Sequence, residues 1–217
     1  MLTVLLPSGL KAQALTPETI KRIINNQPDY AGDYLIVRGG ETVKLRLIKK
    51  GESFRHEIMP LQNAASQINE QYRSYKIITL NIPGKPILAL DPQEGTYTEL
   101  PDNFRFPTPD IAGYFQAALR SAGTVSGREM GTETIDGHKA KRIKISFGSA
   151  DEGTIYVADE LKGLIVKMEA KDSGGPMSFT MSNVSLEVLQ SLFEVPPGYK
   201  KVDFDSFLAA IKQKVVK

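Results

Sequence analysis

Apolar and polar residues alternate at every second position in several short segments of the second half of the chain. The alternation runs through Lys141 to Ile145, Gly153 to Val157 and Met177 to Met181. Turn-forming pairs, Asp136-Gly137 and Gly174-Gly175, lie between such segments. A period of two is typical of strands with one buried and one wet face. This half of the chain is therefore predicted to form an antiparallel β-meander.

A second set of strand candidates precedes it. Glycine-containing pairs such as Gly39-Gly40 and Pro83-Gly84 separate these candidates, as expected for turns. The predicted strands are Tyr34 to Arg38, Val43 to Ile48, Phe54 to Ile58, Tyr75 to Leu80, Ile87 to Leu90 and Thr96 to Leu100.

Three helices are predicted around the two meanders. The first begins at Thr16-Pro17-Glu18, which has the form of an N-cap, a first-turn proline and a first-turn acid, and ends near Asn26. The second spans Asp110 to Leu119, between the meanders, and its apolar side carries Ile111, Tyr114, Phe115, Ala118 and Leu119. The third opens near Asp203 and carries the stripe Phe204, Phe207, Leu208, Ile211 and Val215.

The tail from Leu192 to Tyr199 contains the pair Pro196-Pro197. Proline lacks the N–H group that a strand ladder needs, so this pair is predicted to end the last strand and to turn the chain toward the C-terminal helix.

Composition excludes several classes of function. The chain has 217 residues, enough for one sizeable core, and no polar linker divides it, so a single domain is predicted. Its 27 basic and 25 acidic residues give a net charge of +2 and are interspersed, which argues against a nucleic-acid partner. Cysteine is absent, which excludes disulfides, thiolate metal sites and a thiol nucleophile.

The N-terminus resembles the second half of a secretory signal. An apolar run from Leu2 to Leu10 is followed by Ala12-Gln13-Ala14, which predicts cleavage after Ala14 and a mature domain of residues 15–217. The charged segment that opens such signals is missing. Two interpretations follow: the natural start lies upstream of Met1, or the run is a first buried strand. With no lipid-attachment cysteine and no other segment long enough to span a bilayer, the first interpretation predicts a soluble, exported, periplasmic protein.

Catalytic motifs are absent from the sequence. It contains no Gly-x-Ser-x-Gly elbow, no phosphate loop and no dinucleotide fingerprint. His56 and His138 have no ligand-like spacing, so ordinary polar roles are favoured over metal binding. We therefore expect neither an enzyme nor a metal or cofactor.

Soft apolar side chains are frequent on one face of the predicted strands. Methionine suits a wall that must fit a variable, greasy ligand, but it also fills gaps in cores, so both a ligand cavity and ordinary core packing explain the pattern. These side chains are Val43, Leu45, Leu47, Leu164, Val166, Met168, Met177, Phe179 and Met181.

Charged residues two apart in strands should pair on one face, as for Arg55 with Glu57 and Lys167 with Glu169. A solvated outer surface is the simpler interpretation. The alternative is a contact between Arg55 and a lipid head group, since Arg55 lies beside the apolar face that Phe54, His56 and Ile58 carry.

Several segments resemble the periplasmic lipoprotein-carrier superfamily, the LolA-like proteins and their outer-membrane lipoprotein-sorting relatives. They are Tyr30 to Val37, Gly51 to Ile58, Ile87 to Pro92 with Tyr97, the hairpin from Gly131 to Gly137, and Phe193 to Tyr199, which is similar to the family's closing Phe-x-x-Pro-Pro-Gly segment. The resemblance covers nearly the whole mature chain. The chain departs from the classical carriers in its long segment 81–109 and in its extra C-terminal helix.

The resemblance implies a mainly β (α+β) fold, an incomplete antiparallel β-barrel whose concave apolar face is covered by helices. It implies a non-enzymatic carrier, without cofactor, that moves acyl chains of lipoproteins or another lipid across the periplasm toward the outer membrane, with a membrane transporter and an outer-membrane acceptor as further partners. A monomer is expected. The alternative is a regulatory sensor of the same fold that docks on a partner protein. The wall of the cavity would comprise Leu45, Leu47, Phe54, Ile58, Val166, Met168, Phe179 and Met181, and the lid Ile111, Tyr114, Phe115 and Leu119.

Overall fold

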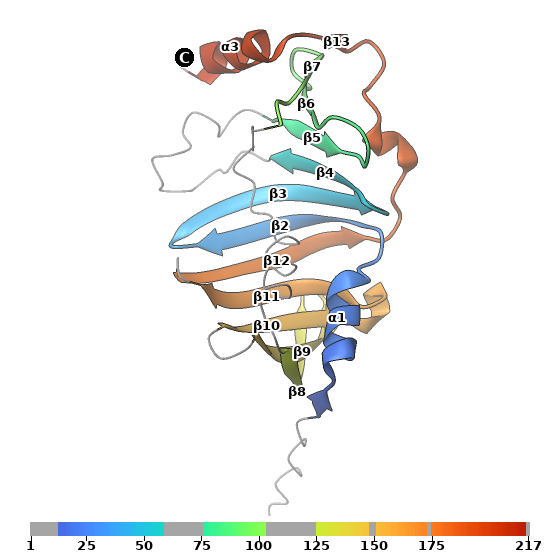
Figure 1. Ribbon diagram of the computed structural model, residues 1–217, viewed down its shortest axis with the longest axis vertical. Coiled ribbons are helices and arrows are strands. Elements are labelled where there is room, and N and C mark those ends of the chain that lie inside the picture. Colours follow the sequence, from blue (N-terminus) through green and yellow to red (C-terminus); the bar gives the residue numbers. More distant parts are fainter. Residues whose placement is uncertain (1–12, 59–75, 103–124, 148–150, 173–174, 216–217) are drawn as a thin grey trace, which may run out of the picture.

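The computed structural model describes residues 13–58, 76–102, 125–147, 151–172 and 175–215. Within these ranges the chain is mainly β, with two α-helices and two short 3-10 helices (Figure 1). The strands are β1 (Ala14–Leu15), β2 (Tyr30–Arg38), β3 (Glu41–Lys50), β4 (Ser53–Ile58), β5 (Ile78–Asn81), β6 (Leu88–Asp91), β7 (Thr96–Glu99), β8 (Val125–Ile135), β9 (His138–Phe147), β10 (Asp151–Ala158), β11 (Leu164–Asp172), β12 (Gly175–Ser185) and β13 (Lys200–Lys201). The helices are α1 (Pro17–Asn25), η2 (Asp159–Leu161), η3 (Gln190–Phe193) and α3 (Phe204–Val215).

All of these strands belong to one open, curved sheet in the order β1-β8-β9-β10-β11-β12-β2-β3-β4-β5-β6-β7-β13 (Figure 1). Both predicted meanders are present, as β2 to β7 and β8 to β12. They are joined edge to edge by antiparallel pairing of β12 with β2. Only β13 runs parallel to its neighbour, β7. The predicted mainly β fold with an open, curved sheet is thus confirmed.

The register places apolar side chains from both meanders in continuous rows on one face of the sheet. Residues directly opposite each other in a ladder project to the same face. One row crosses six neighbouring strands and consists of Ile143, Ile155, Met168, Phe179, Ile36 and Val43. A parallel row consists of Met181, Tyr34, Leu45, Ile58 and Ile77. We call this the helix face, and the opposite one the outer face.

Helix α1 packs on the helix face at the β8 end of the sheet. Thr16 caps it, its Oγ1 accepting a hydrogen bond from Thr19 N at 3.2 Å, as the sequence predicted. Ile20 and Ile24 are buried in the same cluster as the strand side chains. Ile20 approaches β8 at Gly127, where an added Cβ would lie 2.7 Å from Ile20 Cδ1. Glycine at this position therefore sets how closely the helix can approach the sheet.

The predicted end of the last strand is wrong. Strand β12 ends at Ser185, and Pro196-Pro197 lies well beyond it, after η3. The ladder is already irregular at Asn183, whose φ of 51° accompanies a register shift between Ser182 and Ser185, and Ser185, opposite Ala31, is the last residue of β12 that pairs with β2.

The segment from 186 to 199, which we call the strap, then crosses the outer face. Phe193 packs with Ala31 and Ile48 on that face, and Tyr199 packs against the cluster of Ile78, Leu80 and Leu90. The strap thus covers β2 to β6 from the outside and carries the chain to the free edge of β7, where β13 pairs.

Helix α3 follows β13 and returns to the helix face at this other end of the sheet (Figure 1). Asp203 caps it, its Oδ1 accepting from Ser206 N at 2.8 Å. Phe207 and Ile211 are buried with Ile77, Ala89 and Leu100, and Phe204 packs against this cluster. Docking of the predicted stripe is therefore confirmed for these three residues; Leu208 is half-buried.

Some predicted features lie outside the described residues. They include the helix from Asp110 to Leu119, with the proposed lid residues Ile111, Tyr114, Phe115 and Leu119, and the N-terminal run of residues 1–12. The predicted cleavage point, between Ala14 and Leu15, falls within β1. In the part of the chain that the structure describes, no helix is long and apolar enough to cross a membrane.

Candidate ligand-binding face

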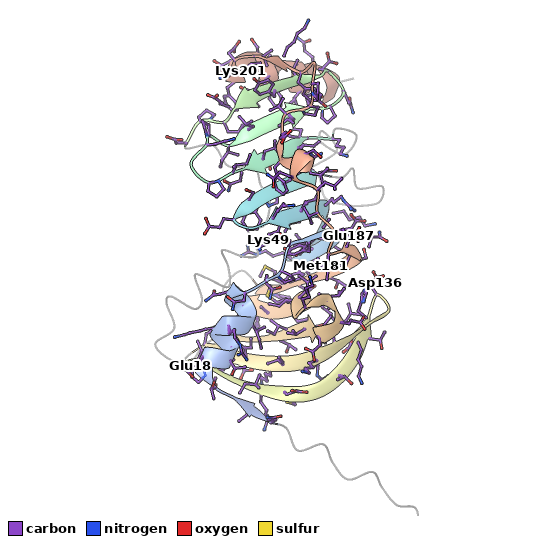
Figure 2. The ribbon with its side chains drawn as sticks, turned by 90° about the vertical axis from the view of Figure 1, so that its right-hand side faces the viewer. Glu18, Lys49, Asp136, Met181, Glu187 and Lys201 are labelled. Carbon is purple, nitrogen blue, oxygen red and sulfur yellow. The ribbon has the colours of Figure 1, made fainter. Side chains whose placement is uncertain are left out.

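The structure brings the predicted wall together on the helix face. Six of its side chains belong to one buried cluster, Phe54 packs against that cluster, and Ile58 lies directly opposite Leu45. Met181, which is 0 % exposed, lies near the middle of the sheet (Figure 2). The six are Leu45, Leu47, Val166, Met168, Phe179 and Met181. Both meanders therefore contribute to one apolar surface, which is also the main core of the protein.

A pair of tyrosines on this surface was missed by the sequence analysis. Tyr30 and Tyr34 project from the same face of β2, and their hydroxyl oxygens are 2.9 Å apart. Gly32 lies between them, and an added Cβ there would come within 2.6 Å of Met181 Cε, so the methionine fills the space that glycine leaves. The ring of Tyr34 also packs against Phe179, with centroids 5.3 Å apart. The signal in the sequence was Tyr-x-Gly-x-Tyr within a strand, which places both rings on one face.

Burial keeps both hydroxyls neutral. Tyr30 is 6 % exposed and Tyr34 is 4 % exposed. Desolvation raises the pKa of Tyr30 to about 12, despite an opposing effect of its hydrogen bond with Tyr34. Desolvation, reinforced by the neighbouring Tyr30, raises the pKa of Tyr34 well above its ordinary value of 10.0. The pair is therefore an uncharged hydrogen-bonding group in an apolar setting.

These raised pKa values predict alkaline destabilisation. A tyrosine whose pKa is higher in the folded state stabilises the fold fully below pH 10, and this contribution is lost as the pH rises through about 12. We expect wild-type protein to lose stability over this range, and the Tyr30→Phe/Tyr34→Phe double variant to lose less. Denaturant unfolding at stepped alkaline pH, together with tyrosinate absorbance, measures both effects. Identical pH profiles for the two proteins would contradict the expectation.

Arg55 lies away from the predicted wall. It projects to the outer face, opposite Ile48 and Leu80 in the ladder, whereas Phe54 and Ile58 project to the helix face. Its guanidinium Nε donates to Glu57 Oε1 at 2.7 Å. Its Nη2 lies 2.6 Å from the same oxygen. Its Nη1 donates to the Leu192 carbonyl oxygen of the strap at 2.8 Å. A head-group contact by Arg55 would therefore have to be made on the outer face.

Within the described ranges, neither histidine belongs to a cluster of metal-ligand type. His56, on the helix face, stacks on Phe54 and lies 3.4 Å from Thr79 Oγ1. His138 Nδ1 lies 2.6 Å from Glu160 Oε1 at an exposed turn. Among the described residues, no group of three His, Asp or Glu side chains could hold a metal ion.

No protein-family model matches the sequence, and no curated protein matches it either. Solved structures do match in fold. MucB superposes with a TM-score of 0.51 at 11% identity, over 83% of this chain and 62% of MucB. The Pseudomonas aeruginosa MucA/MucB complex gives a TM-score of 0.50 at 13% identity, over 83% of this chain and 60% of that chain. The Mycobacterium tuberculosis lipoprotein LppX gives 0.42 at 12% identity, over 79% of this chain and 96% of LppX.

The chain therefore shares its fold with MucB, and this is the LolA-like fold that the sequence resembles. It spans about 60% of the length of the MucB chains that it matches. At these identities the likeness establishes the fold alone.

Proposed function

We propose that this protein is a non-enzymatic carrier that binds acyl chains, of lipoproteins or of another lipid, on its helix face. The observation that carries the proposal is the continuous apolar surface built by both meanders, rich in methionine and aromatic side chains and lying between α1 and α3. Met168, Met177 and Met181 all lie in this surface, and unbranched thioether side chains can repack around a guest.

Burial of hydrocarbon supplies the driving force. Each CH₂ group removed from water contributes about 0.8 kcal/mol, so a chain of several methylenes can bind without any catalytic or ionic group. Because the wall is buried, binding requires the side chains on the helix face to separate. The predicted helix from Asp110 to Leu119 would act as the lid in this proposal.

The same proposal places the protein in the periplasm. It would be exported by the signal-like N-terminus, receive its cargo from a membrane transporter and release it to an acceptor at the outer membrane. This part rests on the family resemblance of the quoted segments.

The absence of tryptophan from the chain provides a direct test. A Phe179→Trp variant carries a single tryptophan on the helix face, and a Leu35→Trp variant carries one on the outer face of the paired strand, at a site that is already 38% exposed. We expect a brominated acyl chain to quench the fluorescence of the Phe179→Trp variant strongly and that of the Leu35→Trp variant little, because bromine quenches only at short range. Titration of both variants, with circular dichroism as the folding control, makes the comparison.

Equal quenching of the two variants would contradict binding on the helix face. Absence of quenching in both, together with no lipid recovered by organic extraction of the natural protein, would contradict the carrier proposal altogether.

A second candidate function is docking on a partner protein. It is favoured by one observation, that MucB, with which this chain shares its fold, forms a complex with MucA. A protein with this role would fail both lipid tests and would instead be recovered from the cell envelope in a complex with another protein.

A further inference from the structure

The Tyr30–Tyr34 pair has more hydrogen-bonding capacity than its own contact uses. Two hydroxyls carry two protons, and their mutual bond of 2.9 Å uses one. The second O–H proton has no partner in the part of the chain that the structure describes. A buried hydroxyl left without a bond costs free energy, so a ligand that offers an acceptor here gains an interaction that plain hydrocarbon cannot make.

The pair lies inside the apolar surface proposed to take the acyl chain. Phe179 packs on the ring of Tyr34, Met181 lies against Gly32 between the rings, and Leu45 lies directly opposite Tyr34 on β3. A chain bound along the helix face at β12, β2 and β3 would therefore pass the two hydroxyls.

A charged side chain of the neighbouring strand projects to the same face at this position. Lys49 lies directly opposite Tyr30 on β3 (labelled in Figure 2). Its Nζ donates to the carbonyl oxygens of Gln27 at 3.0 Å and Pro28 at 3.4 Å, at the exit from α1, and lies 3.9 Å from Asp29 Oδ1. The ammonium group of Lys49 is thus bonded to backbone carbonyls at the end of α1. The donor that the tyrosine pair offers to a ligand is a neutral hydroxyl.

We infer that the Tyr30–Tyr34 pair is the polar anchor of the site and donates a hydrogen bond to the neutral carbonyl of an acyl ester or amide. The inference rests on the proposed acyl-binding function and names the ligand class. An ester or amide carbonyl can accept the hydrogen bond that the pair offers, and it carries no charge into the apolar surface. A free carboxylate would have to lose its hydration and would gain only one hydrogen bond from a neutral donor, so its burial costs far more free energy than that of an ester or amide carbonyl.

The test measures the preference of the protein for an ester over a carboxylate and over a plain hydrocarbon of similar length. Methyl palmitate, palmitate and hexadecane compete against a fluorescent hydrocarbon probe on wild-type protein and on the Tyr30→Phe/Tyr34→Phe double variant. We expect wild type to prefer the ester over hexadecane, and this preference to fall about 3- to 10-fold in the double variant, the size of one lost hydrogen bond. Hexadecane should bind both proteins equally.

The double variant suits this purpose because it removes both partners of a buried bond and keeps the shape of both rings, so stability should change little. Tyr156→Phe is the matched control. Tyr156 is also a buried strand tyrosine, but its hydroxyl donates to Glu169 Oε2 at 3.0 Å on the opposite face, so its loss should leave the ester preference unchanged.

A measurement on wild type alone keeps the inference testable if the double variant misfolds. The infrared stretch of a ¹³C-labelled ester carbonyl should lie at lower frequency in the complex than for the same ester dissolved in hexane, because hydrogen bonding weakens the C=O bond. A carbonyl frequency in the complex equal to that in hexane would contradict the inference.

Three outcomes of the competition experiment overturn the inference. If the double variant still binds hexadecane and keeps an unchanged preference for the ester, the tyrosine pair is not the polar anchor, and the carrier proposal is unaffected. Tighter binding of palmitate than of the ester makes the ligand class wrong. No binding of any of the three compounds by wild type removes the proposed function and this inference together.

Discussion

Replacement of Phe207 by alanine should lower the free energy of unfolding by about 3–5 kcal/mol, the cost of emptying a fully buried phenylalanine site. Phe207 is 2 % exposed and holds α3 against Ile77, Ala89 and Leu100. Denaturant unfolding of wild type and variant measures the loss.

Lys212→Ala is the control in the same helix. Lys212 is exposed, so its replacement should change stability by less than about 0.5 kcal/mol. Similar small effects of both substitutions would mean that α3 is only loosely docked, and would favour a role for this helix in binding a partner.

Glu57→Gln should be the second most damaging change, at about 3 kcal/mol, because removal of one partner leaves the other charge buried without compensation. The side chains of Arg55 and Glu57 are 11% and 10% exposed, and Lys76 Nζ contacts the second oxygen of Glu57 at 2.8 Å. Glutamine keeps the size of the side chain but cannot neutralise Arg55. Thermal and denaturant unfolding measure the loss.

The exposed pair of Lys144 and Glu152, 2.7 Å apart, is the matched control. Glu152→Gln should cost at most about 1 kcal/mol, since such surface pairs contribute little. A similar cost for the two substitutions would contradict a special role for the buried pair.

The same glutamate should make stability depend on pH. Burial alone would raise the pKa of Glu57, but hydrogen bonds from Lys76 and Arg55 outweigh it, so the pKa is lowered from 4.5. A carboxylate whose pKa is lower in the folded state stabilises the fold above its unfolded pKa, and this contribution is lost as the pH falls through the folded pKa. Wild type should therefore lose more stability below pH 4.5 than Glu57→Gln does.

The sequence predicts this fold well where the signal is local. Alternation with a period of two is a property of each strand by itself, so strands β2 to β7 and β9 to β12, and the wall residues Leu45, Met168 and Phe179, were predictable without knowledge of their partners. Strand β8, which begins at Val125, was not among the predicted strands. Helix α1 was predictable for the same reason, because Thr16 and Pro17 act within one turn.

Features that depend on distant pairing could not be predicted in this way. Nothing local to β12 indicates that it pairs with β2, or that the strap crosses the outer face after Ser185. Arg55 is a different case. The period of two already places it opposite to Phe54 and His56, so its position on the outer face followed from the pattern that identified the strand.

The pairing of β2 with β12 also constrains the order of folding. The side chains of Asp33 and Asn183, 150 residues apart, are hydrogen-bonded across this seam. Closing so long a loop is entropically costly, and folds dominated by such non-local contacts form slowly. Until the segment that forms β12 has left the ribosome or the export channel, the N-terminal meander exposes β2 as an open edge, where another chain can add as a further strand. Chains that end before Gly175 should therefore aggregate rather than form a smaller stable domain.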